Sequence, residues 1–286
     1  MNNSRARAEE VLNGLERLPA MPAPVLRVVQ LAGDPNASSG EIADCICAEP
    51  SLAADVLRVA NSPYYGVPGE VTNVRMGVIM LGTTTIRSLA MMAAAYTWFE
   101  QPELCSRRGQ AMWDHSLSVA IFAGCLARRY VPTVEEETFC CGLLHDLGKI
   151  VLTVSLTSQY EAILERAQTR RIPDAQAERL ALGFDHTDVG DILAERWGLP
   201  AMLREAVRYH HNPEAARQHR AFAEFVNAAD YLYWRMVEGE AFEPSRRPVD
   251  PEVASKFELG NQERLDELFD TANAKREALS VLLKAA

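Results

Sequence analysis

The segment "CGLLHDLGKIVL", residues 140–151, places an adjacent histidine and aspartate, His145 and Asp146, inside an apolar run. A buried imidazole needs a hydrogen-bonding partner, and a buried carboxylate needs more than one. Imidazole nitrogens and carboxylate oxygens are also good ligands for Fe, Mn, Zn or Ni. The pair therefore indicates either a metal site suited to phosphate chemistry or the remnant of one in a protein that only binds partners.

Further polar side chains lie on the apolar faces of segments with helical spacing. Residues three, four and seven positions apart share one side of a helix. By this rule His115 lies on the side of Val119 and Phe122. The same rule places three other side chains on apolar faces: His186, His210 and Asp230. His219 stands in the polar stretch "PEAARQHRAF" and is expected at the surface.

Five helical segments thus each direct a histidine or an aspartate towards the interior. A lone histidine on an apolar face is more often a core residue with its hydrogen bonds satisfied. Several polar groups that converge in one core would satisfy one another if one or two divalent cations lay among them. We expect such a cation, with core histidines as the alternative.

The elements that would position these residues are helices. Alternation typical of a strand persists nowhere, whereas helical spacing recurs, broken by Pro and Gly. The sequence predicts an all-α, multi-helix bundle in three parts: residues 15–100, 101–235 and a C-terminal helical extension, 236–286. In the first part we expect a Ser-capped helix in "SSGEIADCICAE", a helix beginning at Pro50, and two helices divided near Gly82. The terminal helix "QERLDELFDTANAKREALSVLLKAA" is expected to pack on its own lobe rather than form a dimer seam, and the oligomeric state stays open.

Composition narrows the function classes. The net charge of −10 disfavours a nucleic-acid or anionic-membrane partner, because such surfaces need clustered Lys and Arg. The most apolar stretch, "SLAMMAAAYTWF" at 88–99, is too short to span a bilayer. The charged N-terminal residues do not match a secretory signal, so we expect a cytoplasmic protein whose six cysteines are free thiols.

The segment "GLLHDLGK" resembles the signature of the HD phosphohydrolase superfamily. The superfamily's H…HD…D metal set is matched in order by His115, His145, Asp146 and Asp230. The extra ligands of the binuclear HD-GYP phosphodiesterases are matched by His186, His210 and His211. Two positions depart from that pattern. The paired histidines continue as "HHNPEAARQH" without a Gly-Tyr-Pro run, and Ala111 stands where some members place a Glu ligand.

The longer resemblance is to the HDOD (HD-related output domain) family. It covers residues 15–235 through pieces such as "LPAMP", "DPNAS", "EPSLAADVLRVANSPYYG", "VIMLG", "WDHSLSVA" and "FVNAADYL". The resemblance implies a bundle in which an N-terminal helical lobe, 15–100, packs on an HD-like lobe, 101–235. It also implies a role as an output of bacterial signalling. Many members have degenerate HD sites and act by binding, whereas here every ligand position is filled.

The resemblance also implies roles for individual residues. With a metal pair held by the seven matched ligands, Asp146 would bridge the ions and a bound water would attack phosphorus. Lys149 would meet a phosphate oxygen, or would instead be a solvated C-terminal lysine that complements a helix dipole. Asp185 and Asp188 are expected to cap the helix near His186, with orientation of the histidine ligands as the alternative.

Two functions follow. The first is a signalling output module that contacts a partner protein, with its metal structural or absent. The alternative is a metal-dependent phosphohydrolase or phosphodiesterase acting on a nucleotide or phosphodiester, with Asp146 and Lys149 as catalytic residues. Tyr64 and Tyr65, in a Pro- and Gly-rich loop, are expected to pack on the HD-like lobe rather than contact a partner.

Overall fold

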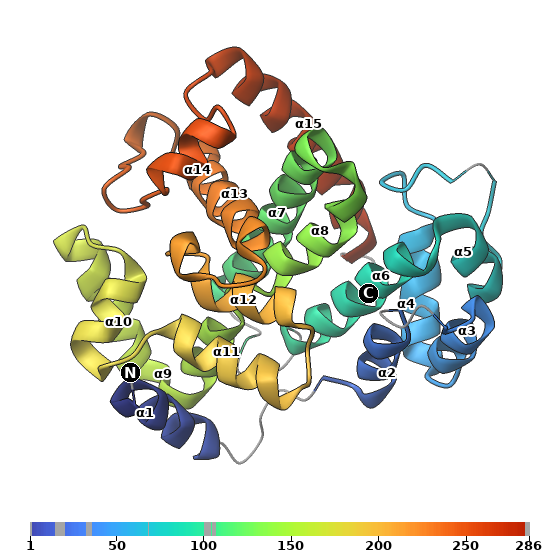
Figure 1. Ribbon diagram of the computed structural model, residues 1–286, viewed down its shortest axis with the longest axis horizontal. Helices are drawn as coiled ribbons and strands as arrows, with labels where there is room; N and C mark the ends of the chain where they lie inside the picture. The colour runs from blue at the N-terminus through green and yellow to red at the C-terminus, as the bar shows by residue number, and fades with distance from the viewer. Residues whose placement is uncertain are drawn as a thin grey trace.

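The computed structural model describes residues 2–14, 21–32, 36–67, 69–99, 104 and 107–283, and no strand occurs among them. The protein is an all-α bundle, as predicted (Figure 1). Its α-helices are α1 (Asn2–Asn13), α2 (Ala23–Ala32), α3 (Ser39–Cys47), α4 (Pro50–Ala60), α5 (Val74–Leu81), α6 (Thr83–Phe99), α7 (Arg107–Tyr130), α8 (Glu135–Leu144), α9 (Leu147–Arg170), α10 (Asp174–Leu182), α11 (His186–Arg196), α12 (Ala201–Tyr209), α13 (Arg220–Glu238), α14 (Pro251–Lys256) and α15 (Gln262–Leu283).

Helices α2 to α6 form the N-terminal lobe, with α6 against both α2 and α4 (Figure 1). Ser38 caps α3 in a reciprocal box with Glu41, and Pro50 occupies the first turn of α4. Gly82 ends α5 at φ 83°, a left-handed conformation that a side chain would disfavour. The expected helix starts and the division at Gly82 are therefore confirmed.

Helices α7 to α13 form the HD-like lobe, in which two glycines allow close helix crossings. A Cβ on Gly142 of α8 would lie 2.7 Å from the Cα of Ala120 in α7. A Cβ on Gly148 of α9 would lie 1.9 Å from the carbonyl oxygen of His186 in α11. Both glycines belong to "GLLHDLGK", so this segment sets the backbone distances around the histidines as well as supplying two of the polar groups.

The two lobes pack on each other through α6 and α8. Tyr64 lies 6.4 Å from Phe139 of α8 between ring centroids, so the Tyr64–Tyr65 loop packs on the HD-like lobe, as expected. Helix α15 lies along α7, with Phe269 5.8 Å from Phe122, and thus covers its own lobe. The predicted boundary at residues 100 and 101 lies outside the described residues.

Helix α1 is separated from α2 to α6 of the N-terminal lobe and lies on α11 and α9 (Figure 1). Its Ala8 and Leu12 are buried, and Arg5 pairs with Asp191 and Glu195 of α11. The first helix of the chain therefore contributes to the surface of the HD-like lobe.

Among the described residues, one helical stretch, 132–170, is long and apolar enough to cross a membrane, but 72% of its most apolar window is buried inside the protein. This stretch joins α8 and α9 and contains Cys140 and Cys141, both buried as free thiols. Burial raises the pKa of Cys140 to about 12. We expected the cysteines to be small core residues; Cys125, Cys140 and Cys141 are, whereas Cys45 is half-buried and Cys47 is exposed. Cys105 lies outside the described residues.

Candidate metal centre

The His145–Asp146 pair lies at the junction between α8 and α9. Helix α8 ends at Leu144 and α9 begins at Leu147, so the backbone turns at the pair. His145 is 1% exposed and Asp146 is 6% exposed. Helical spacing predicted that at least one of the two faces inward; both do, because the helix is interrupted there.

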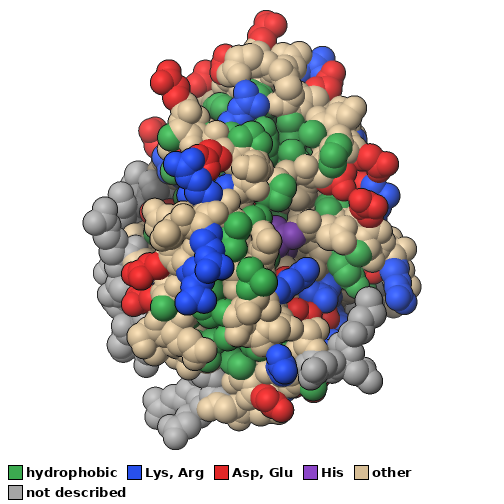
Figure 2. Space-filling view, turned by 90° about the vertical axis from the view of Figure 1, so that its left-hand side faces the viewer, with side chains coloured by type: hydrophobic (Ala, Val, Ile, Leu, Met, Phe, Trp, Pro, Cys, Tyr) green, Lys and Arg blue, Asp and Glu red, His purple; other side chains and the backbone are tan. Residues whose placement is uncertain are grey.

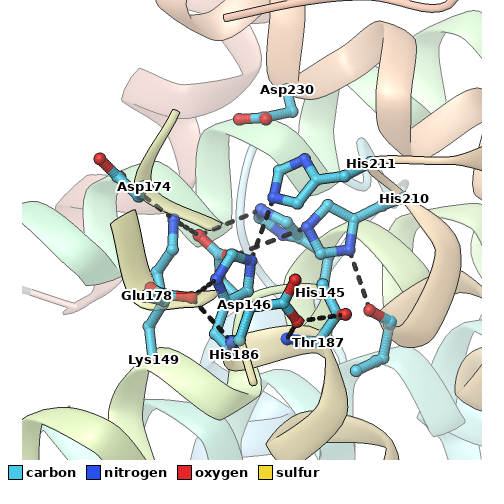
Figure 3. A network of polar contacts seen from close by, with 12 residues as sticks. His145, Asp146, Lys149, Asp174, Glu178, His186, Thr187, His210, His211 and Asp230 are labelled. Carbon is cyan, nitrogen blue, oxygen red and sulfur yellow. Dashed lines mark hydrogen bonds and ion pairs between the residues drawn. The ribbon is translucent and has the colours of Figure 1, made fainter. Parts of the chain in front are cut away.

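The carboxylate of Asp146 lies between two groups of histidines (Figure 3). Its Oδ2 is 3.2 Å from Nε2 of His115 and 3.4 Å from Nε2 of His145. Its Oδ1 is 3.3 Å from Nε2 of His186 and 3.8 Å from Nε2 of His210. Each oxygen of one carboxylate thus belongs to a different histidine group, an arrangement suited to bridging two ions.

Hydrogen bonds orient three of the imidazoles. His145 donates from Nδ1 to the carbonyl oxygen of Gly142 at 2.7 Å, and His210 donates from Nδ1 to that of Val207 at 3.0 Å. His186 donates from Nδ1 to the carboxylate of Glu178 at 2.7 Å. Because these partners only accept, Nδ1 carries the proton and Nε2 is free to act as a ligand. All three Nε2 atoms face Asp146.

Four buried atoms of this cluster lack a hydrogen-bond partner: Nδ1 of His115, Oδ1 of Asp146, Nε2 of His210 and Oδ1 of Asp230. Buried acceptors without a donor destabilise a fold by about 1–3 kcal/mol each. Two cations, one beside Asp146 and Asp230 and the other beside Asp146 and His210, would satisfy three of the four. The donor set therefore fits a metal better than a self-sufficient polar core.

Interatomic distances agree with this fit. The Nε2 atoms of His115 and His145 are 3.1 Å apart, and so are those of His186 and His211. Two nitrogens about 2.0–2.1 Å from one tetrahedral ion lie about 3.3 Å apart. Two groups have ligand atoms mutually within 4.8 Å: His115, His145 and Asp146, and His186, His210 and His211.

Electrostatics favours the ionised form of Asp146 and the neutral form of His210, which are the forms that bind metal. Burial raises the pKa of Asp146, but His145 and then Lys149 outweigh it and hold that pKa well below its usual range. Burial, with the nearby His145, lowers the pKa of His210 to about 3. For His186 burial also lowers the pKa, but the Glu178 carboxylate outweighs it and raises the pKa to about 8. Asp146 is therefore ionised and His210 neutral, whereas His186 is basic enough to hold a proton when no metal competes for it.

Lys149 lies inside the site. Its Nζ is 2.8 Å from Oδ2 of Asp146 and 3.7 Å from Oδ2 of Asp174, with its side chain 15% exposed. Burial lowers the pKa of Lys149, but these two carboxylates outweigh it and raise the pKa above its ordinary value. The interpretation as a solvated lysine at a helix C-terminus is wrong, since Lys149 lies in the first turn of α9 and its side chain is only 15% exposed.

The remaining residues singled out by the sequence differ in burial and in distance from the cluster. Asp230, on α13, reaches the edge of the cluster with Oδ1 3.4 Å from Nε2 of His115. His211 extends to the surface, and His219 is half-buried at the start of α13, outside the cluster. Asp185 caps α11 in a reciprocal box with Asp188, which confirms their expected role.

The sequence pattern missed Glu178. It is 0% exposed and accepts hydrogen bonds from Tyr160 Oη at 2.7 Å and from both the main-chain N–H and Nδ1 of His186. Helix α10 carries alanines and leucines as well as charged residues, and no local pattern marks a single Glu as buried. Only the packing of α9 and α11 on α10 reveals that Glu178 orients His186.

Fold and site together define an all-α protein with an HD-type histidine and aspartate centre. The HDOD domain model matches residues 18–213, and the chain belongs to this family. An HDOD domain protein of unknown function from Geobacter sulfurreducens is 27% identical, with a TM-score of 0.80 and 98% of each chain covered. A candidate signal transduction protein from Marinobacter aquaeolei is 24% identical, with a TM-score of 0.74, over 99% of this chain and 67% of that chain.

A candidate phosphohydrolase from Shewanella amazonensis shares the fold at 21% identity, with a TM-score of 0.71, over 97% of this chain and 99% of that one. An uncharacterised protein of Treponema pallidum is 23% identical over 273 residues, which are 95% of this chain. The chain spans about half of that relative's length, 52%.

Proposed function

We propose that this protein is a divalent-metal-dependent phosphohydrolase within the HDOD family. The observation that carries the proposal is the position of Asp146, whose two oxygens face two separate groups of histidine nitrogens. A merely structural histidine core would not need unpaired, mutually facing ligand atoms. The fold shared with a candidate phosphohydrolase from Shewanella amazonensis supports the same reaction class.

The proposed roles follow from the contacts. His115, His145 and Asp146 would hold one ion, and His186, His210 and His211 a second, with Asp146 as the bridge. Asp230 would complete the first group from α13. When bound, a divalent ion supplies a water of lowered pKa and positive charge next to a phosphoryl oxygen.

Lys149 has a different task. Its ammonium group has three N–H donors, and among the described residues it faces two carboxylates, Asp146 and Asp174. A remaining N–H can donate to a phosphoryl oxygen. Lys149 would also hold the Asp146 carboxylate in the orientation that faces both histidine groups.

The test combines metal analysis with turnover. We expect the purified protein to bind Mn²⁺ or Fe²⁺ and to hydrolyse a generic phosphoester, and Asp146→Asn to lose both. Lys149→Met should still bind metal, with lower affinity, and lose turnover. A wild-type protein that holds metal but hydrolyses neither phosphomonoesters nor phosphodiesters would contradict the proposal.

A second function, a signalling output module that acts on a partner protein, is supported by the HDOD membership and by the N-terminal lobe packed on the site-bearing lobe. The two functions are compatible, because the lobe surfaces are separate from the buried centre. Metal without turnover, together with a partner that binds the wild type and Asp146→Asn equally, would favour this function over hydrolysis.

A further inference from the structure

A cavity of about 300 Å³ adjoins the candidate metal centre. One end is polar and is formed by His115, Asp146 and Lys149. The remaining wall is mainly apolar and aromatic, with Met112, Ile150, Leu164, Tyr233 and Trp234 among its residues. Figure 2 shows a histidine within a hollow on one face of the molecule, with hydrophobic and basic side chains around it.

Two aromatic rings of α13 lie next to His115, one of the proposed metal ligands. The ring of Tyr233 is 4.6 Å from that of His115, and the ring of Trp234 is 5.5 Å from it. The guanidinium of Arg247 lies 3.7 Å over the Trp234 ring and contacts Asp174 at 3.3 Å. Trp234 is therefore held in place by Arg247 and contributes to a flat wall of the cavity.

Helix α9 lines the cavity on both sides of a kink. The kink is at Thr157, whose φ of 37° and ψ of −111° are not helical. Lys149 and Ile150 precede the kink, and Tyr160 and Leu164 follow it. Positive φ is rare for a β-branched residue and is often found at functional sites. The strained residue thus lies in the segment that shapes the cavity.

Charge and space at the polar end favour a phosphate group. The charged residues that line the cavity are two cations, Arg108 and Lys149, and two carboxylates, Asp146 and Asp174. These charges balance, so a divalent ion would make this end positive. Ala111 is exposed at the cavity, where its methyl group leaves room one turn before His115.

The geometry points to a phosphomonoester carrying one planar, largely apolar ring as the ligand of this cavity. This inference rests on the proposed function and names its substrate class. The phosphate would meet the metal centre and Lys149, while the ring would pack against Trp234 and Tyr233. Ligand pockets range from about 300 to 1,000 Å³, so this one lies at the small end of that range and has room for a single ring.

The experiment measures binding rather than turnover. The full chain is loaded with Mn²⁺ and titrated calorimetrically with phenylphosphonate or methylphosphonate, neither of which is a hydrolysable ester. We expect phenylphosphonate to bind at least about tenfold more tightly, and both ligands to require Mn²⁺. Equal affinities for the two ligands, or no saturable binding of phenylphosphonate, would overturn the inference.

Substitutions of Trp234 test whether the phenyl ring of the ligand packs against this residue. Trp234→Leu should reduce the phenyl preference to about threefold or less, and Trp234→Phe should retain most of it. Tyr231→Leu is the matched control, because Tyr231 packs against Phe242 at 5.1 Å and does not line the cavity. An undiminished preference in a folded, Mn²⁺-binding Trp234→Leu protein would contradict the assignment.

A second variant does not depend on removing a large side chain. Ala111→Phe at the exposed position should exclude phenylphosphonate and leave Mn²⁺ affinity unchanged. Unchanged phenylphosphonate binding in Ala111→Phe would count against the cavity as its site.

The hydrolase proposal and the ligand proposal predict different results. If the protein prefers phenylphosphonate but hydrolyses no ester, the ligand proposal stands and the hydrolase proposal is wrong. If the protein hydrolyses an ester but shows no preference for phenylphosphonate, the hydrolase proposal stands and the ligand proposal is wrong. A wild-type protein that binds no Mn²⁺ would contradict both.

Discussion

The two lobes of this protein use polar residues in opposite ways. Within α2 to α6 the buried polar side chains of the described residues are few: Ser62, Arg87 and Ser88. Other polar groups there serve the backbone at helix ends and loops; Asn61, for example, accepts from the Val71 N–H at 2.7 Å. In the HD-like lobe, by contrast, histidines and carboxylates lie inside the core around Asp146, and the half-buried Lys149 pairs with Asp146.

This difference shows how a bundle can contain a reactive interior without losing its fold. Burying an unpaired charge costs more free energy than the net folding stability of a small helical lobe. In the HD-like lobe hydrogen bonds position several of these groups, as Glu178 positions His186. In its described residues the N-terminal lobe contributes mainly apolar packing, and its buried Arg87 pairs with Glu137 of α8, so changes in the two lobes should have different consequences.

The largest effect is expected at the α9–α11 crossing. Gly148→Ala would place a Cβ 1.9 Å from the His186 carbonyl oxygen, so the helices must separate. We expect a loss of about 3 kcal/mol or more in unfolding free energy, together with loss of metal binding. Denaturant unfolding and metal titration measure the two quantities.

The matched glycine in the other lobe is Gly77, where a Cβ would lie 3.3 Å from a Val71 side-chain carbon. Gly260→Ala serves as a second control, since nothing lies within 4 Å of its Cβ position. Both substitutions should leave metal binding intact. An equal loss of stability at Gly77 and Gly148 would break the contrast between the lobes.

Removal of metal should loosen one lobe selectively. A ligand present at about 100 times its Kd stabilises the state that binds it by about 2.7 kcal/mol. We expect chelation of the loaded protein to speed amide hydrogen exchange in α9 to α12, while α3 to α5 keep their protection. Uniform acceleration across both lobes would show that the metal contributes equally to the stability of the whole bundle.

Glu178→Gln should weaken metal binding more than it weakens the fold. The amide can still contact Tyr160 and His186 but no longer increases the basicity of the imidazole. We expect about a 10–100-fold loss in metal affinity, measured by competition with a chromogenic chelator.

The matched control for this prediction is Glu224→Gln, a buried glutamate paired with Arg220 and Lys256 outside the centre. It should lower stability and leave metal affinity unchanged. If both variants lose affinity equally, the effect is general destabilisation and not the orientation of His186.

The smallest effect belongs to the N-terminal lobe. Ser38→Ala removes the cap of α3 and should cost about 1 kcal/mol of unfolding free energy, without a change in metal affinity. Ser39→Ala, one residue later and exposed, should cost much less. Thermal unfolding of the two variants compares their losses of stability. A change in metal affinity in Ser38→Ala would show that the two lobes are energetically coupled.

The sequence alone determined the helical class, several helix ends and most of the centre. Helical spacing and capping residues are local properties, so the helix ends at Ser38, Pro50 and Gly82 follow from their immediate neighbours in the chain. The apolar faces around His115, His186 and His210 predicted that these side chains point inward, and resemblance supplied the adjacent His211. Spacing also predicted that at least one member of the His145–Asp146 pair faces inward.

Tertiary structure decided the rest. That both members of the His145–Asp146 pair are buried depends on the break between α8 and α9. The burial of Lys149 and Glu178 depends on which helices pack against α9 and α10, and periodicity within one helix cannot report a neighbour. The aromatic cavity likewise joins α7, α9 and α13, which are distant in the chain. A sequence determines which face of each helix is apolar, but only the packing of the helices on one another determines which polar side chains come into contact.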